Sequence, residues 1–122
     1  MLQEKQLAQL ATVMPDGSPQ VTPVWVDVED DGSHILVNTV GGRQKARNTA
    51  RDPRVAISVV DSQNWRRYVI VRGRIVEQRR DGADEHIEKL AQRYLGKAFH
   101  HPGDERIILR IKPESVHEQN VS

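Results

Sequence analysis

Residues 38–48 carry the side chains whose types and spacing are best suited to chemistry in this chain. A β-compatible run ends at Thr39, the glycine pair Gly41–Gly42 bends the chain, and a short helical stretch opens with Arg43 and Lys45. The N-terminus of a helix offers free N–H groups and the positive end of a dipole, and an arginine fork binds two phosphate oxygens. The segment therefore predicts a phosphate cradle where a strand meets a helix.

A second interpretation of the same segment stays open, because basic residues near glycines also occur in solvated turns and on exposed helix faces. The spacing fits neither the G-x-x-x-x-G-K-[ST] loop of nucleotide triphosphatases nor the G-x-G-x-x-G turn of dinucleotide-binding folds. Those two site types are not predicted.

The charge of the chain is nearly balanced, with a net charge of +1. Five basic side chains nevertheless fall within 12 residues, and they are Arg43, Lys45, Arg47, Arg51 and Arg54. A local cationic patch on a nearly neutral protein suits a small anion better than a long polyanion. We therefore predict a small-molecule partner and no nucleic-acid partner.

Other site types find little support. The chain has no cysteine, which excludes a disulfide scaffold, a thiolate nucleophile and a cysteine-ligated metal. Ser58 and Ser62 lack the ordered histidine and aspartate of a hydrolase triad, and the adjacent His100 and His101 are typical of a solvated loop. His86 lies among acidic residues and is expected at the surface. We predict no metal site and name no catalytic residue.

The 122 residues fit one domain, residues 1–122, with an apolar share of 37% that is low for a globular protein. A partner subunit would supply further burial, which favours an oligomer. Residues 1–10 have no apolar signal-peptide core, and no apolar run approaches the ~20 residues of a spanning helix. A cytoplasmic protein without a membrane partner is expected.

Alternating and β-branched runs separated by turn residues predict about six strands, and two segments show helical character. The strands are expected at 7–14, 20–28, 35–39, 55–60, 68–77 and 107–111. A short helix is expected at 44–49, and a long amphipathic helix is expected to follow Asp81–Gly82 and to end near Gly96. The first three strands are expected to form an antiparallel meander. Gly73 predicts a bulge or sharp bend, and Pro113 is expected to close the last strand. The fold class is mainly β (α+β), a small barrel with a short and a long helix.

The motifs that follow one another along the chain are 10–13, 15–19, 21–27, 36–39, 42–48, 51–55 and 68–73. As an ordered set they resemble the pyridoxamine 5′-phosphate oxidase-like superfamily of FMN-binding split β-barrels. The branch that they resemble most is group B of the F420-dependent flavin/deazaflavin oxidoreductases. The resemblance implies a split-barrel homodimer with cofactor sites at the subunit interface.

The resemblance also implies roles for particular residues. Twelve are expected at the cofactor: Thr22, Pro23, Val24, Trp25, Asn38, Thr39, Arg43, Gln44, Lys45, Arg47, Asn48 and Tyr68. Arg43 and Lys45 would hold the phosphate, with Arg47 and Asn48 as supports. The strand 22–25 would lie along the ring, and strand alternation allows only one of Val24 and Trp25 to point inward. Trp65, Arg66 and Tyr68 would complete the site from the second subunit.

The activity that the resemblance implies is reduction of an electrophilic double bond, such as an enone, a quinone or a biliverdin-like acceptor, by reduced coenzyme F420. FMN is the alternative cofactor, because both carry a tricyclic ring, a ribityl chain and a phosphate. Arg51, Arg54 or Arg72 can meet the anionic tail that only coenzyme F420 carries. A cofactor carrier without turnover and a phospholigand or nucleic-acid module are the competing functions.

Overall fold

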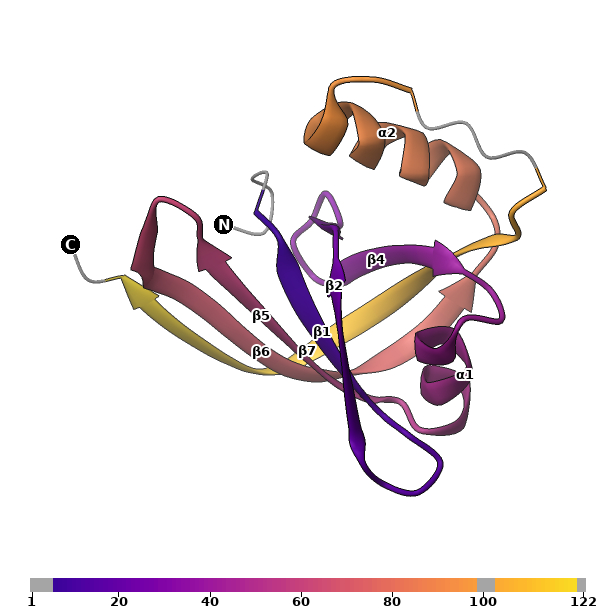
Figure 1. Ribbon diagram of the computed structural model, residues 1–122, viewed down its shortest axis with the longest axis horizontal. Coiled ribbons are helices and arrows are strands. Elements are labelled where there is room, and N and C mark those ends of the chain that lie inside the picture. Colours follow the sequence, from indigo (N-terminus) through magenta and orange to yellow (C-terminus); the bar gives the residue numbers. More distant parts are fainter. Residues whose placement is uncertain (1–5, 99–102, 121–122) are drawn as a thin grey trace.

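The computed structural model describes residues 6–98 and 103–120, and it shows one strongly curled sheet with two helices (Figure 1). The strands are β1 (Ala8–Val13), β2 (Pro19–Val24), β3 (Val26–Val28), β4 (Ile35–Val40), β5 (Arg54–Asp61), β6 (Asn64–Arg79) and β7 (Arg106–Asn120). The helices are α1 (Gln44–Arg51) and α2 (Ala83–Leu95). The predicted loop at His100 and His101 lies outside the described residues. No helix in the described ranges is long and apolar enough to cross a membrane.

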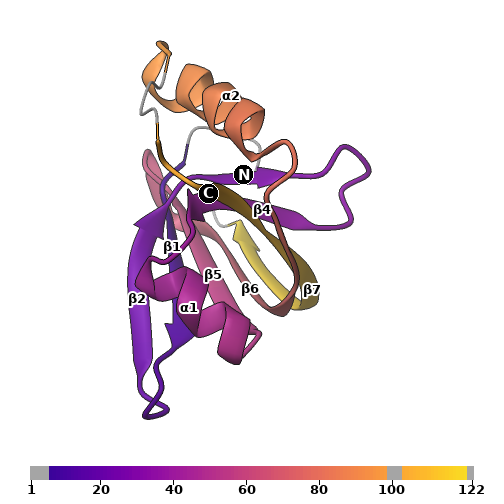
Figure 2. The same ribbon diagram turned by 90° about the vertical axis from the view of Figure 1, so that its right-hand side faces the viewer.

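The order of the strands explains why the sheet closes. The described strands form a single antiparallel sheet in the order β2-β1-β5-β6-β7-β4-β3, so β2 and β3 are its two edges. Only Trp25 separates these edge strands along the chain. The sheet must therefore curl until the end of β2 meets the start of β3 at Trp25. The turned view shows this curl (Figure 2). The predicted mainly β split barrel with a short and a long helix is confirmed.

The prediction of one continuous strand at 20–28 is wrong. This segment divides at Trp25 into two strands, which lie at opposite edges of the sheet. β2 pairs with β1, whereas β3 pairs with β4. The expected contacts between neighbouring strands are present, but as two separate hairpins in place of one meander. Trp25 turns out of the sheet and stacks on Tyr94 of α2, with ring centroids 5.0 Å apart. This aromatic contact fixes the point at which the chain passes from one edge to the other.

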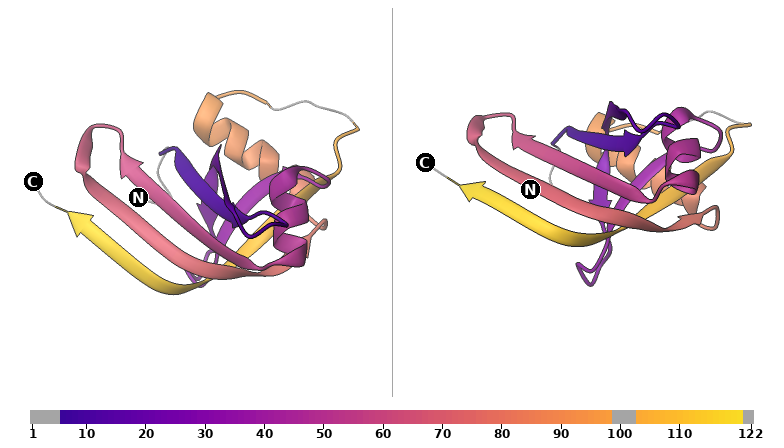
Figure 3. Two further views of the ribbon diagram at one scale, coloured as in Figure 1. Left: turned by 60° about the horizontal axis from the view of Figure 1, so that its bottom comes forward. Right: turned by 90° about the horizontal axis from the view of Figure 1, so that it is seen from below.

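The last two strands are longer than predicted, and Pro113 does not end β7. β6 spans 16 residues and β7 spans 15, and they run beside β5 as a long ribbon (Figure 3). Pro113 is paired with Gly73, where the register between β6 and β7 shifts. A Cβ atom on Gly73 would lie 2.2 Å from the carbonyl oxygen of Lys112. The predicted irregularity at Gly73 is confirmed, and it lets the ladder accommodate a proline.

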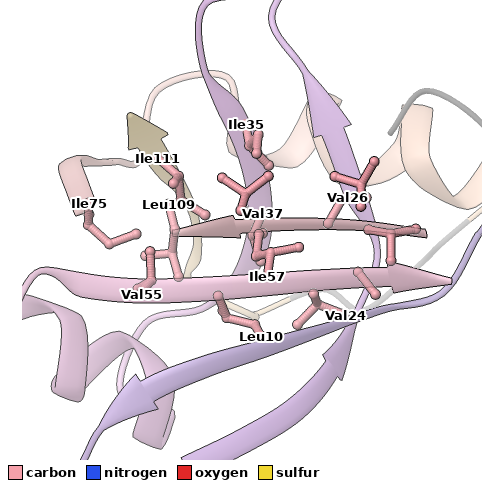
Figure 4. Packing of buried hydrophobic residues seen from close by; sticks show 14 of the residues in the cluster. Leu10, Val24, Val26, Ile35, Val37, Val55, Ile57, Ile75, Leu109 and Ile111 are labelled. Carbon is pink, nitrogen blue, oxygen red and sulfur yellow. The ribbon is translucent and has the colours of Figure 1, made fainter. Parts of the chain in front are cut away.

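Alternate residues of the strands fill the inside of the curled sheet. Leu10, Val26, Ile57 and Leu109 are at most 1% exposed and come from four strands (Figure 4). A separate cluster joins Ile87, Leu90 and Tyr94 of α2 to Trp25. The two clusters meet at the strand break, because Val24 and Val26 belong to the first and Trp25 packs against the second.

Candidate functional site

A cavity of about 370 Å³ lies where the break between β2 and β3 faces the helices. Its wall includes the apolar Leu7 and Ile87, the start of α1, and Arg106 at the beginning of β7. Seven residues of the predicted cofactor set also line it: Pro23, Val24, Trp25, Asn38, Thr39, Arg43 and Lys45. The fold thus brings together the two segments that the sequence singled out, which are 13 residues or more apart in the chain.

The apolar wall follows from strand alternation. Val24 is 7% exposed and belongs to the barrel core, whereas Trp25 is half-buried against α2. Only Val24 therefore points into the barrel, as alternation required. Both residues still line the cavity, because the strand breaks at Trp25, between Val24 and Val26.

Three cations converge on the opposite wall, namely Arg43, Lys45 and Arg106. Burial is the main cause that lowers the pKa of Lys45, and the charges of Arg43 and Arg106 lower it further. Among the described residues that line the cavity there is no carboxylate. Three positive charges in one cavity repel one another, and a bound anion would relieve that repulsion.

Arg106 is a site residue that sequence reasoning missed. Its side chain is 10% exposed, and it lies 3.7 Å from Asp104 and 3.5 Å from the Asn38 amide oxygen. Burial is the main cause that lowers the pKa of its guanidinium. No local pattern signals this residue, because only the pairing of β4 with β7 brings it beside residue 38.

The start of α1 has the unsatisfied donors that anion binding requires. Arg43 is the residue before the first turn, and no side chain caps the helix there. Thr39 lines the cavity and is 2% exposed, and its Oγ1 has no hydrogen-bond partner in the described part of the chain. A buried hydroxyl without a partner is costly unless a ligand supplies one. These features fit a phosphate-bearing group.

Three predicted residues of α1 do not line the cavity and instead hold the helix. Asn48 is fully buried and donates from Nδ2 to Thr12 Oγ1 at 3.0 Å. Gln44 donates to Asn48 Oδ1 at 2.7 Å, and Arg47 donates to Gln44 Oε1 at 2.5 Å. This chain of bonds ties α1 to β1, so these side chains position the cradle from behind.

Thr22 and Tyr68 also lie away from the cavity of their own chain. The buried Thr22 Oγ1 has no partner among the described residues. Tyr68 donates to Gln119 Oε1 at 2.9 Å on the part of β6 that extends away from the helices. Trp65 is 73% exposed near the beginning of the same strand, with the Arg66 guanidinium 5.4 Å from its ring centroid.

The expectation for His86 is wrong. It is 9% exposed because the side of α2 that carries it packs over β4, and its ring lies between Asp27 and Asn38. The helical spacing of polar residues does not show whether His86 faces solvent or a neighbouring strand. The burial of His86 is therefore decided by the tertiary structure.

Comparison with known proteins agrees with this fold. Residues 1–120 match the family model described as pyridoxamine 5′-phosphate oxidase. The F420H(2)-dependent biliverdin reductase of Mycobacterium tuberculosis (strain CDC 1551 / Oshkosh) is 33% identical over 117 residues, covering 94% of this chain and 80% of that protein.

Two solved structures extend the comparison. One described as F420 reductase is 35% identical, with a TM-score of 0.86, and the match covers 95% of this chain and 92% of that chain. The conserved hypothetical protein Rv2991 from Mycobacterium tuberculosis is 26% identical, with a TM-score of 0.74, over 94% of this chain and 77% of that chain. The curled sheet, the cationic cavity and these matches together show that this chain belongs to the pyridoxamine 5′-phosphate oxidase family.

Proposed function

We propose that this protein is an oxidoreductase that binds coenzyme F420 and reduces an electrophilic double bond in a small molecule. The observation that carries the proposal is the cavity that joins three cations to an apolar wall. The printed names of two relatives, a biliverdin reductase that depends on F420H(2) and an F420 reductase, support the same cofactor. When bound, the reduced deazaflavin supplies a hydride to the acceptor.

The cationic wall would hold the phosphate. Arg43 presents a planar fork, Lys45 adds a point charge, and the uncapped start of α1 offers backbone N–H donors. The unpartnered Thr39 hydroxyl can donate to a phosphate oxygen. Arg106 adds a third charge next to them.

The apolar wall would hold the ring. Pro23, Val24 and Trp25 form one side, and Ile87 of α2 contributes to it. Trp25 cannot turn freely, because it stacks on Tyr94 with an interplanar angle of 11°. A fixed apolar surface orients a flat ring and excludes water from the reacting atoms.

A homodimer is part of the proposal, and the sheet provides a surface for it. The strand register places Val60 opposite Tyr68, Ile70 opposite Ser58, and Ser58 opposite Gln9, so these side chains share the face turned away from the core. We call this face the outer face of the sheet.

The outer face exposes several large apolar side chains, and an exposed apolar patch is typical of a protein–protein contact. Leu7, Val21, Val60 and Ile70 are 56%, 59%, 43% and 39% exposed. Leu7 and Pro23 also line the cavity, so the outer face continues into the site. A second copy on this face would close the cavity, with the partner subunit's Tyr68 among the candidates for the added wall.

Titration with reduced and oxidised coenzyme F420, followed by deazaflavin fluorescence, tests the proposed cofactor. We expect saturable binding with one site per chain and reoxidation of the reduced cofactor by a quinone, enone or biliverdin acceptor. Binding without turnover on any acceptor would favour a cofactor carrier. Tight binding of FMN with no binding of coenzyme F420 would overturn the choice of deazaflavin.

FMN is the second candidate cofactor, because the cradle recognises the phosphate that both molecules carry. The family model matched by residues 1–120 supports this alternative. A parallel titration with FMN, followed by quenching of flavin fluorescence, distinguishes the two. DNA binding that weakens as salt rises would instead support the nucleic-acid function.

A further inference from the structure

The side-chain amide of Asn38 is held at three points, two of which involve α2. Its Nδ2 lies 2.7 Å from the carbonyl oxygen of Ala83 and 3.2 Å from Nδ1 of His86. Its Oδ1 lies 3.5 Å from Nη1 of Arg106. Asn38 and Arg106 both line the cavity, whereas Ala83 and His86 lie behind it.

These distances fix which atoms carry the hydrogens. A backbone carbonyl can only accept a hydrogen bond, so the Asn38 atom beside Ala83 must be the amide nitrogen. That nitrogen donates its second hydrogen towards His86, so Nδ1 of His86 must be the unprotonated acceptor. The remaining nitrogen of a neutral ring, Nε2, then carries the proton.

Asp27 accepts a hydrogen bond from this Nε2–H group of His86. His86 Nε2 lies 3.1 Å from Asp27 Oδ2, and Arg93 and Lys89 lie 3.0 Å and 3.3 Å from the same carboxylate. Burial by itself raises the pKa of Asp27, but hydrogen bonds from His86, from the Val28 N–H and from Arg93 hold it well below its usual range. Asp27 therefore stays ionised and keeps the Nε2–H form of His86 in place.

We propose that His86 is a positioning residue that holds the Asn38 amide with its oxygen turned to the cavity, so that Asn38 selects an N–H or O–H donor of the ligand. This inference rests on the proposed function for the identity of that ligand. Flavins and deazaflavins carry such donors as a ring imide and as ribityl hydroxyls. An amide oxygen repels a phosphate, so Asn38 contacts the ring or ribityl part and leaves the phosphate to Arg43 and Lys45.

A protonated His86 would be incompatible with this arrangement. Its Nδ1–H would face the Asn38 nitrogen, which is also a donor. The Asn38 amide could accept a hydrogen bond from this Nδ1–H only by rotating to bring its oxygen towards His86. Rotation would break the bond to Ala83 and turn the amide hydrogens towards Arg106. The charged groups around the ring are Asp27 of β3, Lys89 and Arg93 of α2, Arg79 of β6, and the acidic Glu29, Asp30 and Asp31 after β3.

The first test is nitrogen NMR of the native protein with labelled histidine. We expect the His86 ring in the Nε2–H form, and an Asn38 side-chain amide signal that shifts when coenzyme F420 is added. An Nδ1–H form would overturn the proposal. This measurement needs no variant, and the form of the ring can be read without any ligand.

The second test is a double-mutant cycle on affinity for coenzyme F420. We expect His86→Ala to weaken binding about tenfold, and the double variant His86→Ala with Asn38→Leu to bind no more weakly than Asn38→Leu alone. Lys89→Ala is the matched control, because Lys89 contacts Asp27 but not Asn38, and it should bind as the native protein does. Losses that multiply, or an unchanged affinity in His86→Ala, would overturn the proposal.

Failure of the proposed function remains distinguishable from failure of this inference. If the native protein binds no coenzyme F420, both the proposed cofactor and the proposed contact between that cofactor and Asn38 are wrong. The NMR form of His86 still decides whether the histidine fixes the Asn38 amide. If His86→Ala does not fold, an Asn38 amide signal unaffected by the cofactor would be the contradicting result.

Discussion

At the scale of single residues, the site combines two recognition surfaces with different chemistry. Arg43 and Lys45 present charge, whereas Asn38 presents a neutral oxygen whose orientation α2 determines. A phosphate and a ring system differ in the same way, since one is an anion and the other a flat group with polar edges. The arrangement allows binding of the two parts to be altered separately.

The double substitution of Arg43 and Lys45 by alanine tests the anionic part. We expect affinity for coenzyme F420 to fall by about 3–6 kcal/mol, since each lost charged hydrogen bond contributes about 1.5–3 kcal/mol. Lys97→Ala is the control, because Lys97 is an exposed cation just after α2 that does not line the cavity. Equal affinities in the native protein and the double variant, measured by fluorescence titration, would refute the cradle.

Asp27 predicts how stability responds to acid. Its pKa is lower in the folded protein than the ordinary value of 3.8, so its ionised form stabilises the fold above that value. This contribution is present at neutral pH and is lost progressively as the pH falls below about 4. Urea unfolding between pH 6 and 3 should show the loss. The Asp27→Asn variant should be less stable than the native protein at pH 6, and its stability should depend less on pH. An equal dependence of the free energy of unfolding on pH in both proteins would contradict this role of Asp27.

At the scale of elements, the register shift between β6 and β7 allows two long strands to continue past a proline. Gly73 permits the close approach of the Lys112 carbonyl, and the ladder resumes on the other side. The same two strands run from the helices to the part of the outer face that carries Ile70. The register shift at Gly73 thus lets β6 and β7 stay paired from the barrel to the proposed dimer surface.

Gly73→Ala should destabilise the protein by about 1–3 kcal/mol, because the new methyl group would force β6 and β7 apart. Gly41→Ala is the control, since a Cβ atom there would lie 3.5 Å from its nearest neighbour, the Glu105 carbonyl oxygen. Free energies of unfolding from urea titration provide the comparison. Equal stability of both variants would show that the strands can separate without cost.

At the scale of the whole molecule, the apolar outer face and the open cavity belong to one surface. Leu7 contributes to both, so dimer formation and ligand binding should be coupled. If a second copy completes the cavity, a protein that cannot dimerise should bind the cofactor less tightly even though its own cations are intact.

The double variant Val60→Glu with Ile70→Glu tests this coupling. We expect the native protein to sediment as a dimer and the variant as a monomer with weaker affinity for coenzyme F420, because charges on the covered face would be desolvated. Leu95→Glu is the control, since Leu95 is 49% exposed at the end of α2 and away from the outer face. A native monomer, or a monomeric variant with full affinity, would contradict the proposal.

The sequence by itself determined the features that depend on local chemistry. The break at Gly41–Gly42, the helix that follows it and the irregularity at Gly73 all appear where residue types required them. The resemblance of the ordered motifs supplied the split barrel, and the family match confirms it. Pro113 was misjudged because a proline ends a strand only where its missing N–H is needed, and the register shift removes that need.

Only the tertiary structure decided which side chains meet. Arg106 enters the site because β7 pairs with β4, and His86 is buried because α2 packs over that strand. The division of 20–28 into β2 and β3 depends on the stacking of Trp25 on Tyr94, 69 residues later in the chain. Contacts between distant segments depend on strand order and packing, which local propensity and periodicity do not encode.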